Sequence, residues 1–172
     1  SSYLDARGRE QLRVSRLAMD VIGGDTDYSQ DPRFTVPRSG ASAQPPVARP
    51  YYSPVYFRKD SEPYMRLAVA GRDPGVTVAE LNLKFIWDVV SQIKVGKAGR
   101  AYVVDDRGHL VAHPDMSLVL QKSDLSRLPQ VRAAIAAPGA APGEPITIAT
   151  DPEGRQVLTA SARVQPLGWT VF

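Results

Sequence analysis

The sequence contains no cysteine and only two histidines in 172 residues. Without cysteine the chain can form no disulfide framework, and it offers neither a thiolate nucleophile nor a thiolate metal site. It also lacks an apolar run of the roughly 18–20 residues that a membrane-spanning helix requires, and no signal peptide is evident at its start. Because the sequence begins abruptly at Ser1, we expect it to be a fragment of a longer protein.

The chain also lacks a large excess of either positive or negative charge. The net charge is +3, and Lys and Arg are spread over both halves of the chain. Proteins that bind nucleic acid gather their basic residues in a patch or along one element, so nucleic acid is not an expected partner. The hydrophobic content of 43% is that of an ordinary soluble globular protein. The length allows one domain or two small ones.

The clearest local signal is a β-hairpin in the middle of the chain. Residues 101–104 are rich in Tyr and Val, which favour a strand, and residues 109–113 return as its partner. Between them Asp105-Asp106-Arg107-Gly108 predicts a turn, because Asp side chains bond to nearby backbone and Gly adopts a positive φ at low cost. Pro114 ends the pairing, since it has no N–H to donate.

Both histidines lie in the second strand of this hairpin. His109 and His113 are expected on one face, roughly 13 Å apart at 3.3 Å per residue. That is too far to share a metal ion, so we expect no metal site and no cofactor. His113 with Asp115 offers a general base in principle. No nucleophile motif accompanies them, and Ser117 is too generic to count, so no catalytic residue is expected.

The start of the chain predicts a related hairpin. A turn over residues 6–8 precedes an alternating strand over residues 11–17, and the first strand lies in residues 1–5 or is cut away. The spacing Asp5-x-x-Gly8 resembles the turn that ends at Gly108, which indicates a faint internal repeat.

Residues 18–50 predict mostly irregular structure, because Pro and Gly interrupt any long element. One short helix is expected here, with Asp31 as its N-cap and Pro32 in its first turn. Residues 38–50 are expected to form a loop.

Three antiparallel strands are predicted next, over residues 51–58, 63–70 and 76–83. Alternation divides the second of them into two faces. We expect one face to pack against core helices and the other to be mixed in character; the first carries Met65, Leu67 and Val69, and the second Tyr64, Arg66, Ala68 and Ala70.

A helix is predicted over residues 83–95, with Asn82 as its cap. Its apolar residues recur at helical spacing and give one face, made of Phe85, Ile86, Val89, Val90 and Ile93. We expect this helix to join two halves of the chain.

The last third predicts a short turn at residues 118–120, a helix over 129–137, and strands over 146–149, 156–164 and 169–172. The order hairpin, helices, three strands thus occurs twice. That order predicts an α+β fold.

The stretch from Gly96 to Asp115, Gly-x-x-Gly-x-Ala-Tyr-Val-Val-Asp-x-x-Gly-x-Leu-x-Ala-His-Pro-Asp, resembles the hairpin that opens the second module of double Cache (PAS-like) sensor domains. Residues 75–83 are similar to the last strand of that family's first module, and residues 85–90 to the helix that joins the modules. Residues 167–171 resemble the last strand of a membrane-proximal module.

The resemblance implies two tandem PAS-like modules, each an antiparallel sheet with flanking helices. The membrane-distal module would cover residues 1–83, without its N-terminal helix. The connecting helix would cover 84–96, and the membrane-proximal module 97–172.

The same resemblance implies the periplasmic domain of an inner-membrane signalling protein, with a membrane helix on each side. We expect a histidine kinase, or otherwise an adenylate or guanylate cyclase or a chemoreceptor. The full-length protein would be homodimeric. The fragment itself is expected to be monomeric and to have no enzyme activity, because the helix that typically mediates dimerisation is missing.

The family places its ligand in the first module, which directs attention to six residues there: Tyr52, Tyr56, Arg58, Tyr64, Arg66 and Glu80. Arg offers a planar fork for a carboxylate, and Tyr offers an aromatic wall with a hydroxyl. Glu80 falls where amino-acid-binding members carry an Asp, and it would hold an ammonium group. The Arg-x-Trp element of those members is not visible. We expect the ligand to be a small carboxylate or an amino-acid-like molecule.

Two alternatives stay open. The domain could be a structural or dimerisation module of a membrane cyclase or chemoreceptor with no ligand of its own. Tyr52 and Tyr64 would then fill the first module, and Arg58 and Arg66 would pair on the surface with Asp60 or Glu62. A hydrolase that uses His113 is the other alternative.

Overall fold

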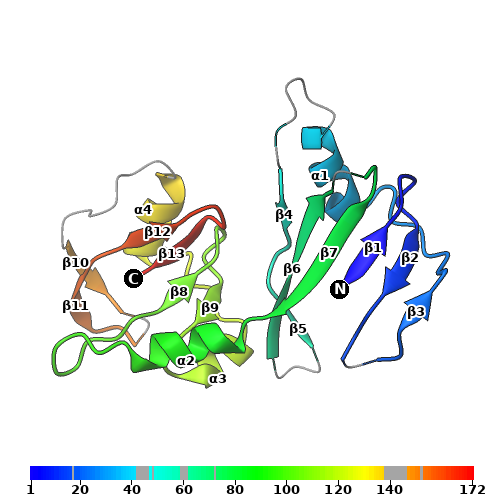
Figure 1. Cartoon of the computed structure of the whole chain (residues 1–172). Coiled ribbons are helices and arrows are strands. Elements are labelled where there is room, and N and C mark those ends of the chain that lie inside the picture. Colours follow the sequence, from blue (N-terminus) through cyan, green and yellow to red (C-terminus); the bar gives the residue numbers. More distant parts are fainter. Residues whose placement is uncertain are drawn as a thin grey trace. The chain divides into compact units, whose positions relative to one another are not determined.

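The computed structural model describes residues 1–16, 18–41, 47, 49–58, 62–71, 73–137, 147–151 and 153–172. The chain divides into two compact units (Figure 1). The first comprises Ser1–Tyr56 and Tyr64–Asn82, and the second Phe57–Pro63 and Leu83–Phe172. Each unit combines an antiparallel sheet with helices, so the predicted α+β class is confirmed.

The first sheet has the strand order β3-β2-β1-β7-β6-β4, and β5 also pairs with β6. Its elements are β1 (Ser2–Leu4), β2 (Glu10–Arg13), β3 (Val21–Ile22), α1 (Pro32–Ala41), β4 (Tyr51–Tyr52), β5 (Tyr56–Arg58), β6 (Glu62–Ala70) and β7 (Val76–Asn82). The predicted first strand therefore lies in residues 1–5, and the second is shorter than predicted.

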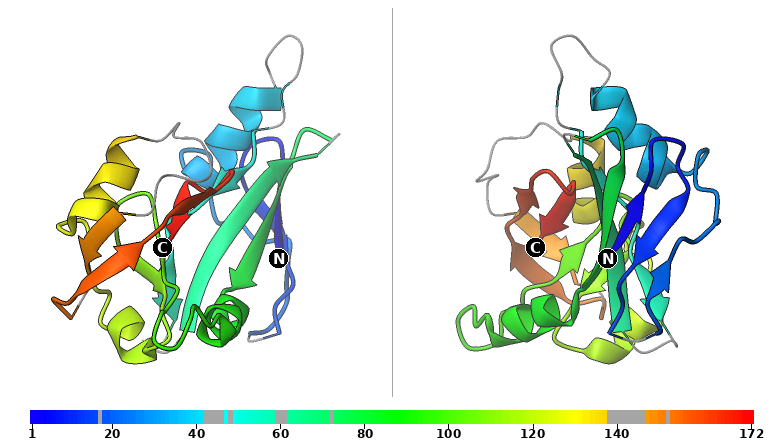
Figure 2. Two further views of the ribbon diagram at one scale, coloured as in Figure 1. Left: turned by 90° about the vertical axis from the view of Figure 1, so that its left-hand side faces the viewer. Right: turned by 45° about the vertical axis from the view of Figure 1, so that its right-hand side comes forward.

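Helix α1 lies against β4 and β7 (Figure 2). It begins where predicted, because the Asp31 carboxylate accepts the backbone N–H of Arg33 at 2.8 Å. The predicted loop over residues 38–50 is wrong at its start, since the helix continues past Pro37 to Ala41. Residues 42–46 and 48 of that prediction lie outside the described residues.

The face of the sheet that α1 covers is not the predicted one. Ala68 is buried in a core with Phe34 from α1, together with Leu4, Val76 and Val78. Of the residues that were expected to pack inward, Val69 is 40% exposed, whereas Met65 is buried. Alternation in the sequence separates the two faces of β6 but does not tell which of them a helix covers. The packing of α1 decides this, and it covers the face that carries the small Ala68.

The same turn closes the first hairpin of both units. The Asp5 carboxylate accepts the backbone N–H groups of Arg7 and Arg9, and Asp105 does the same for the residues two and four positions after it. Gly8 and Gly108 have φ values of 80° and 89°. A Cβ on either would lie within 2.9 Å of the backbone of a serine, Ser29 or Ser126. The predicted internal repeat is confirmed at this turn.

The second unit contains a four-stranded sheet of order β12-β13-β8-β9 and a separate pair, β10-β11. Its elements are α2 (Lys84–Gln92), β8 (Val103–Val104), β9 (Leu110–Ala112), α3 (Met116–Leu120), α4 (Pro129–Ala136), β10 (Thr147–Thr150), β11 (Gln156–Thr159), β12 (Ala162–Val164) and β13 (Trp169–Val171). The order β9-β8-β13-β12 matches β2-β1-β7-β6 of the first unit.

One predicted strand of this unit is in fact two. Residues 156–159 pair with β10, whereas residues 162–164 pair with β13, so the expected strand over 156–164 is wrong. Ile146, expected to begin the preceding strand, lies outside the described residues.

Helix α2 buries only part of the predicted face, with Val90 from that face and Trp87 from outside it. Trp87 and Val90 are buried, whereas Phe85 and Val89 are 61% and 58% exposed. The indole N–H of Trp87 donates to the carbonyl of Val111 at 2.9 Å, which sets the rotation of the helix. The predicted Asn82 cap is also wrong, because Leu83 occupies the N-cap position without a side-chain bond.

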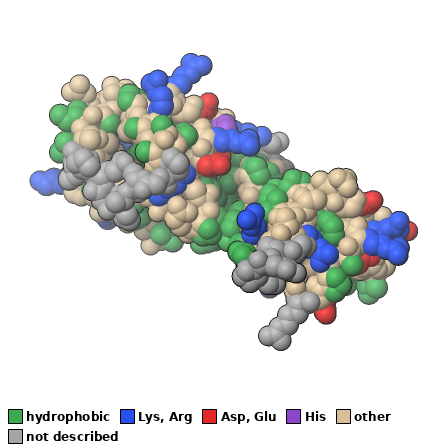
Figure 3. Space-filling model, turned by 90° about the horizontal axis from the view of Figure 1, so that it is seen from above, with side chains coloured by type: hydrophobic (Ala, Val, Ile, Leu, Met, Phe, Trp, Pro, Cys, Tyr) green, Lys and Arg blue, Asp and Glu red, His purple; other side chains and the backbone are tan. Residues whose placement is uncertain are grey.

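Side chains of both charges are interspersed with hydrophobic and other side chains over the face shown in Figure 3. That distribution agrees with the mixed-charge surface expected from the sequence. Among the described residues, no helix combines the length and the apolar character needed to cross a membrane.

Candidate functional site

A cluster of polar and aromatic side chains lies at one end of the helix-covered face of the first sheet. The register of β6 and β7 sets Arg66 opposite Glu80 and Tyr64 opposite Asn82. It also sets Ala68 opposite Val78, and both belong to the core under α1. Because side chains two residues apart share a face, the same face is apolar under the helix and becomes polar towards Arg66.

Glu80 is the centre of this cluster. Its carboxylate accepts a hydrogen bond from the hydroxyl of Tyr56 and lies 3.6 Å from the Nε of Arg66. The Arg66 guanidinium carbon lies 4.5 Å from the centre of the Tyr56 ring. The side chains of Arg66 and Glu80 are 33% and 25% exposed, so both remain within reach of solvent.

The tyrosines form the wall of the cluster. The rings of Tyr56 and Tyr64 stack with centroids 6.2 Å apart, and the Tyr64 hydroxyl accepts a hydrogen bond from the Asn82 amide at 3.1 Å. A guanidinium, a carboxylate and two stacked phenols together can hold a carboxylate, an ammonium group and the apolar part of a small molecule.

Four of the six predicted site residues are thus brought together within the first unit; the other two are Tyr52 and Arg58. Tyr52 pairs with Leu67, so it points to the face opposite Arg66. Tyr51, one residue earlier, pairs with Ala68 and packs against the core. Arg58 lies at the exposed end of β5 and belongs to the second unit.

Two residues of the cluster were missed. The Ser53 hydroxyl accepts the backbone N–H of Arg66 at 2.8 Å, and the Ser53 N–H donates to the Arg66 carbonyl. Asn82 supports Tyr64. Asn82 could have been found by its spacing of two from Glu80, whereas nothing local in the sequence marks Ser53. The predicted pairing of Arg66 with Glu62 or Asp60 is replaced by the pair with Glu80, and Asp60 lies outside the described residues.

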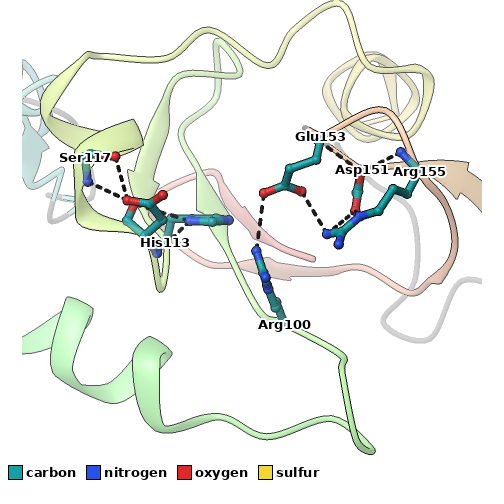
Figure 4. A network of polar contacts seen from close by, with 7 residues as sticks. Arg100, His113, Ser117, Asp151, Glu153 and Arg155 are labelled. Carbon is teal, nitrogen blue, oxygen red and sulfur yellow. Dashed lines mark hydrogen bonds and ion pairs between the residues drawn. The ribbon is translucent and has the colours of Figure 1, made fainter.

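A second polar network surrounds His113 in the other unit (Figure 4). The Nδ1 atom of His113 accepts the backbone N–H of Asp115 at 2.9 Å. The Asp115 carboxylate accepts both the N–H and the hydroxyl of Ser117, and it caps α3. These two hydrogen bonds lower the pKa of Asp115, while burial lowers the pKa of His113.

This geometry is not that of a hydrolase. In a catalytic triad the carboxylate orients the imidazole and the imidazole receives the proton of the nucleophile. Here the Asp115 carboxylate is bonded to Ser117, and His113 bonds only to backbone. His109 lies apart from it, half exposed beside Asp105. Within the described part of the chain, no three His, Asp or Glu side chains are placed to hold a metal ion.

Comparisons with known proteins agree with the resemblance seen in the sequence. A model of the Cache domain family matches residues 4–172. The extracellular domain of mmHK1S-Z2, a protein named as a histidine kinase, superposes with a TM-score of 0.66 at 16% identity, over 90% of this chain and 58% of that one. No curated protein sequence matches the chain.

Two chemoreceptor domains are similar in fold. The ligand-binding domain of Campylobacter jejuni Tlp3, in complex with 4-methylisoleucine, has a TM-score of 0.65 at 13% identity, over 99% of this chain and 62% of that one. The domain of Pseudomonas aeruginosa PAO1 PctC, in complex with GABA, has a TM-score of 0.63 at 20% identity, over 98% and 70%. This chain therefore spans about three fifths of the length of the first two structures.

Proposed function

This chain belongs to the Cache domain family, and from that membership we propose that it is the ligand-binding sensor domain of a membrane-anchored signalling protein. The ligand is a small carboxylate or an amino-acid-like molecule, bound in the first unit by Arg66, Glu80, Tyr56 and Tyr64. The observation that carries this proposal is the Arg66–Glu80 pair, which lies beside stacked tyrosines where the helix-covered face turns polar.

The ligand chemistry follows from the charges of this pair. A ligand carboxylate would form an ion pair with the guanidinium of Arg66, and a ligand ammonium group would form one with the carboxylate of Glu80. The known ligands of two similar structures, 4-methylisoleucine for Tlp3 and GABA for PctC, carry both groups. Binding would exchange the internal ion pair for two pairs with the ligand.

The wider assignment extends the same proposal. The first unit would be the membrane-distal module, residues 84–96 the connecting helix, and residues 97–172 the membrane-proximal module. The domain would lie in the periplasm as part of a homodimeric inner-membrane protein. A histidine kinase would be the output; the extracellular domain of mmHK1S-Z2 is similar in fold, and so are the chemoreceptor domains.

A thermal-shift screen of amino acids and small carboxylates tests the proposal. A ligand at 100 times its dissociation constant adds about 2.7 kcal/mol, which for a chain of this length is roughly 5–11 °C of melting shift. The affinity of a compound that binds should fall by about 10- to 100-fold in Arg66→Met and in Glu80→Gln. The matched control is Arg9→Met, which removes an exposed ion pair with Asp25.

One observation favours a second candidate, a structural module with no ligand. Glu80, Arg66 and Tyr56 already bond to one another. In that case no compound would raise the melting temperature, and Arg66→Met would lower the stability of the protein. A ligand whose affinity is equal in wild type and in Arg66→Met would overturn the site assignment itself.

A further inference from the structure

We propose that the side chain of Arg66 is a tethered occupant of the site in the first unit, and that the ligand which displaces it is a small guanidino acid. Such a molecule carries both a guanidinium and a carboxylate. The inference rests on the function proposed above and narrows its ligand class. The ligand guanidinium takes the place of the Arg66 guanidinium beside Tyr56 and Glu80, and the displaced Arg66 pairs with the ligand carboxylate.

The structure shows how this site holds a guanidinium. The guanidinium carbon of Arg66 lies 4.5 Å from the centre of the Tyr56 ring, and its Nε lies 3.6 Å from Oε2 of Glu80. An aromatic face and a carboxylate together suit a planar, weakly hydrated cation better than a compact ammonium group. The chemistry around Arg66 therefore indicates which cation a ligand should bring.

The groups that receive this cation are held by contacts that do not involve Arg66. The Tyr56 hydroxyl donates to the Glu80 carboxylate, and the Tyr56 ring stacks on that of Tyr64 with centroids 6.2 Å apart. The amide of Asn82 donates to the Tyr64 hydroxyl at 3.1 Å. These contacts remain when the head of Arg66 leaves, so the site keeps its form for a second guanidinium.

Arg66 is firmly held by its backbone and weakly held by its side chain. The backbone N–H donates to the Ser53 hydroxyl at 2.8 Å, and the carbonyl accepts the Ser53 N–H at 2.9 Å. The side chain is 33% exposed, and its guanidinium has no hydrogen-bond or ion-pair partner other than Glu80 in the part of the chain that the structure describes. Exposed ion pairs and cation–π contacts contribute little, so displacement of Arg66 costs a ligand about tenfold in affinity, which is 1.4 kcal/mol.

The exchange needs no cavity beforehand. A ligand guanidinium has the size and shape of the group that it replaces, and the partly exposed Arg66 head moves towards solvent while its backbone stays in β6. A simple carboxylate is a poorer ligand, because it would separate Arg66 from Glu80 and bring no cation to replace it.

The test uses two acids that differ only in the charge of one group. Guanidinoacetate carries a guanidinium, and ureidoacetate carries an uncharged urea of the same shape. Each is titrated at neutral pH to about 10 mM into the whole 15N-labelled chain, and the backbone amide shifts of β6 and β7 are followed. Guanidinoacetate should give saturable shifts, and ureidoacetate should bind at least about tenfold more weakly. Glu80→Gln should weaken guanidinoacetate binding by about 10- to 100-fold.

A second probe tests whether Arg66 occupies the site. Methylguanidine has the cation but no carboxylate, so it competes with Arg66 and gains nothing from its release. Arg66→Ala should bind methylguanidine about tenfold more tightly than the wild type does. The matched control is Arg9→Ala, which removes an exposed ion pair with Asp25 and should bind like the wild type. The amides of Val76 and Val78, in the core of the first unit, report whether Arg66→Ala is folded.

The comparison of the two acids on the wild type needs no variant, so the inference can fail even where Arg66→Ala does not fold. It is overturned if ureidoacetate binds as well as guanidinoacetate, if neither binds, or if methylguanidine does not prefer Arg66→Ala. An amino acid that binds the wild type through Arg66 while guanidinoacetate does not would overturn this inference and leave the proposed function standing. If no compound binds the wild type, both fail.

Discussion

Mild acid should destabilise the second unit through His113. His113 is only 3% exposed, and burial holds its pKa below the ordinary value of 6.5, against the opposing effect of the Asp115 carbonyl, 3.3 Å from Nδ1, and of the Glu153 and Asp115 carboxylates. The folded state therefore binds a proton less readily than the unfolded state. This contribution to stability is fully present above about pH 6.5 and is lost as the pH falls below it.

The size of the effect has an upper limit. At pH 5.5, one unit below the unfolded pKa, a histidine that stays neutral in the fold costs at most about 1.4 kcal/mol relative to pH 7.5. For a chain of this length that is at most about 3–6 °C of melting temperature. The Asp115 carboxylate does not contribute in this interval, because the hydrogen bonds from Ser117 lower its pKa below 3.8.

The assay is urea unfolding at pH 7.5 and 5.5, followed by tryptophan fluorescence, since both tryptophans report the unit that contains His113. His113→Asn is the informative variant: its amide oxygen can take the place of Nδ1 as acceptor for the Asp115 N–H, and it cannot be protonated. It should lose most of the difference between the two pH values. His109→Asn, at the exposed histidine, should keep that difference. An equal loss of stability at pH 5.5 in wild type and His113→Asn would refute the reasoning.

Three further predictions concern stability. Leu4→Ala should cost about 2–5 kcal/mol, because Leu4 is fully buried in the first core; hydrogen exchange of the β1 and β7 amides measures it, and unchanged protection would contradict it. Asp31→Ala should cost about 0.5–2 kcal/mol through the lost cap of α1, and Asp31→Asn much less, as seen by thermal unfolding. Trp87→Phe should cost about 1–3 kcal/mol, since the Val111 carbonyl loses its donor; a urea midpoint equal to wild type would show that water replaces the indole.

Local chemistry made the turns and two of the helix starts predictable. Asp and Gly at fixed spacing gave the turn that ends at Gly108, and the helices that begin at Pro32 and Pro129 carry their start signals within two residues. These features depend on bonds between neighbours in the chain, such as that from the Arg33 N–H to Asp31.

Features that depend on distant partners were not predictable. Phe85 and Val89 lie on one apolar side of α2, and Trp87 lies on another. Helical periodicity alone does not tell which of these two sides is buried. The bond from Trp87 to Val111, 24 residues away, makes the choice. In the site, the register of β4 decides whether Tyr51 or Tyr52 faces Arg66, and a shift of one residue exchanges them.

The turn that both units share also bonds to a later segment of the chain. In each unit the glycine carbonyl accepts an N–H from a later segment, from Tyr28 or from Leu125. That segment reads Asp-x-Ser-x-x-Pro both times, at residues 27–32 and 124–129, and the proline opens a helix.

The two copies differ at positions next to these shared ones. The proline that opens the helix is followed by Arg33 in the first unit and by Gln130 in the second. The residue eight positions after the turn aspartate is Arg13 in the first unit and His113 in the second. The residues that form this turn and its bond to the later segment are thus alike in both units, whereas residues beside them differ. One short pattern therefore ties the opening hairpin of each unit to the helix that follows it along the chain.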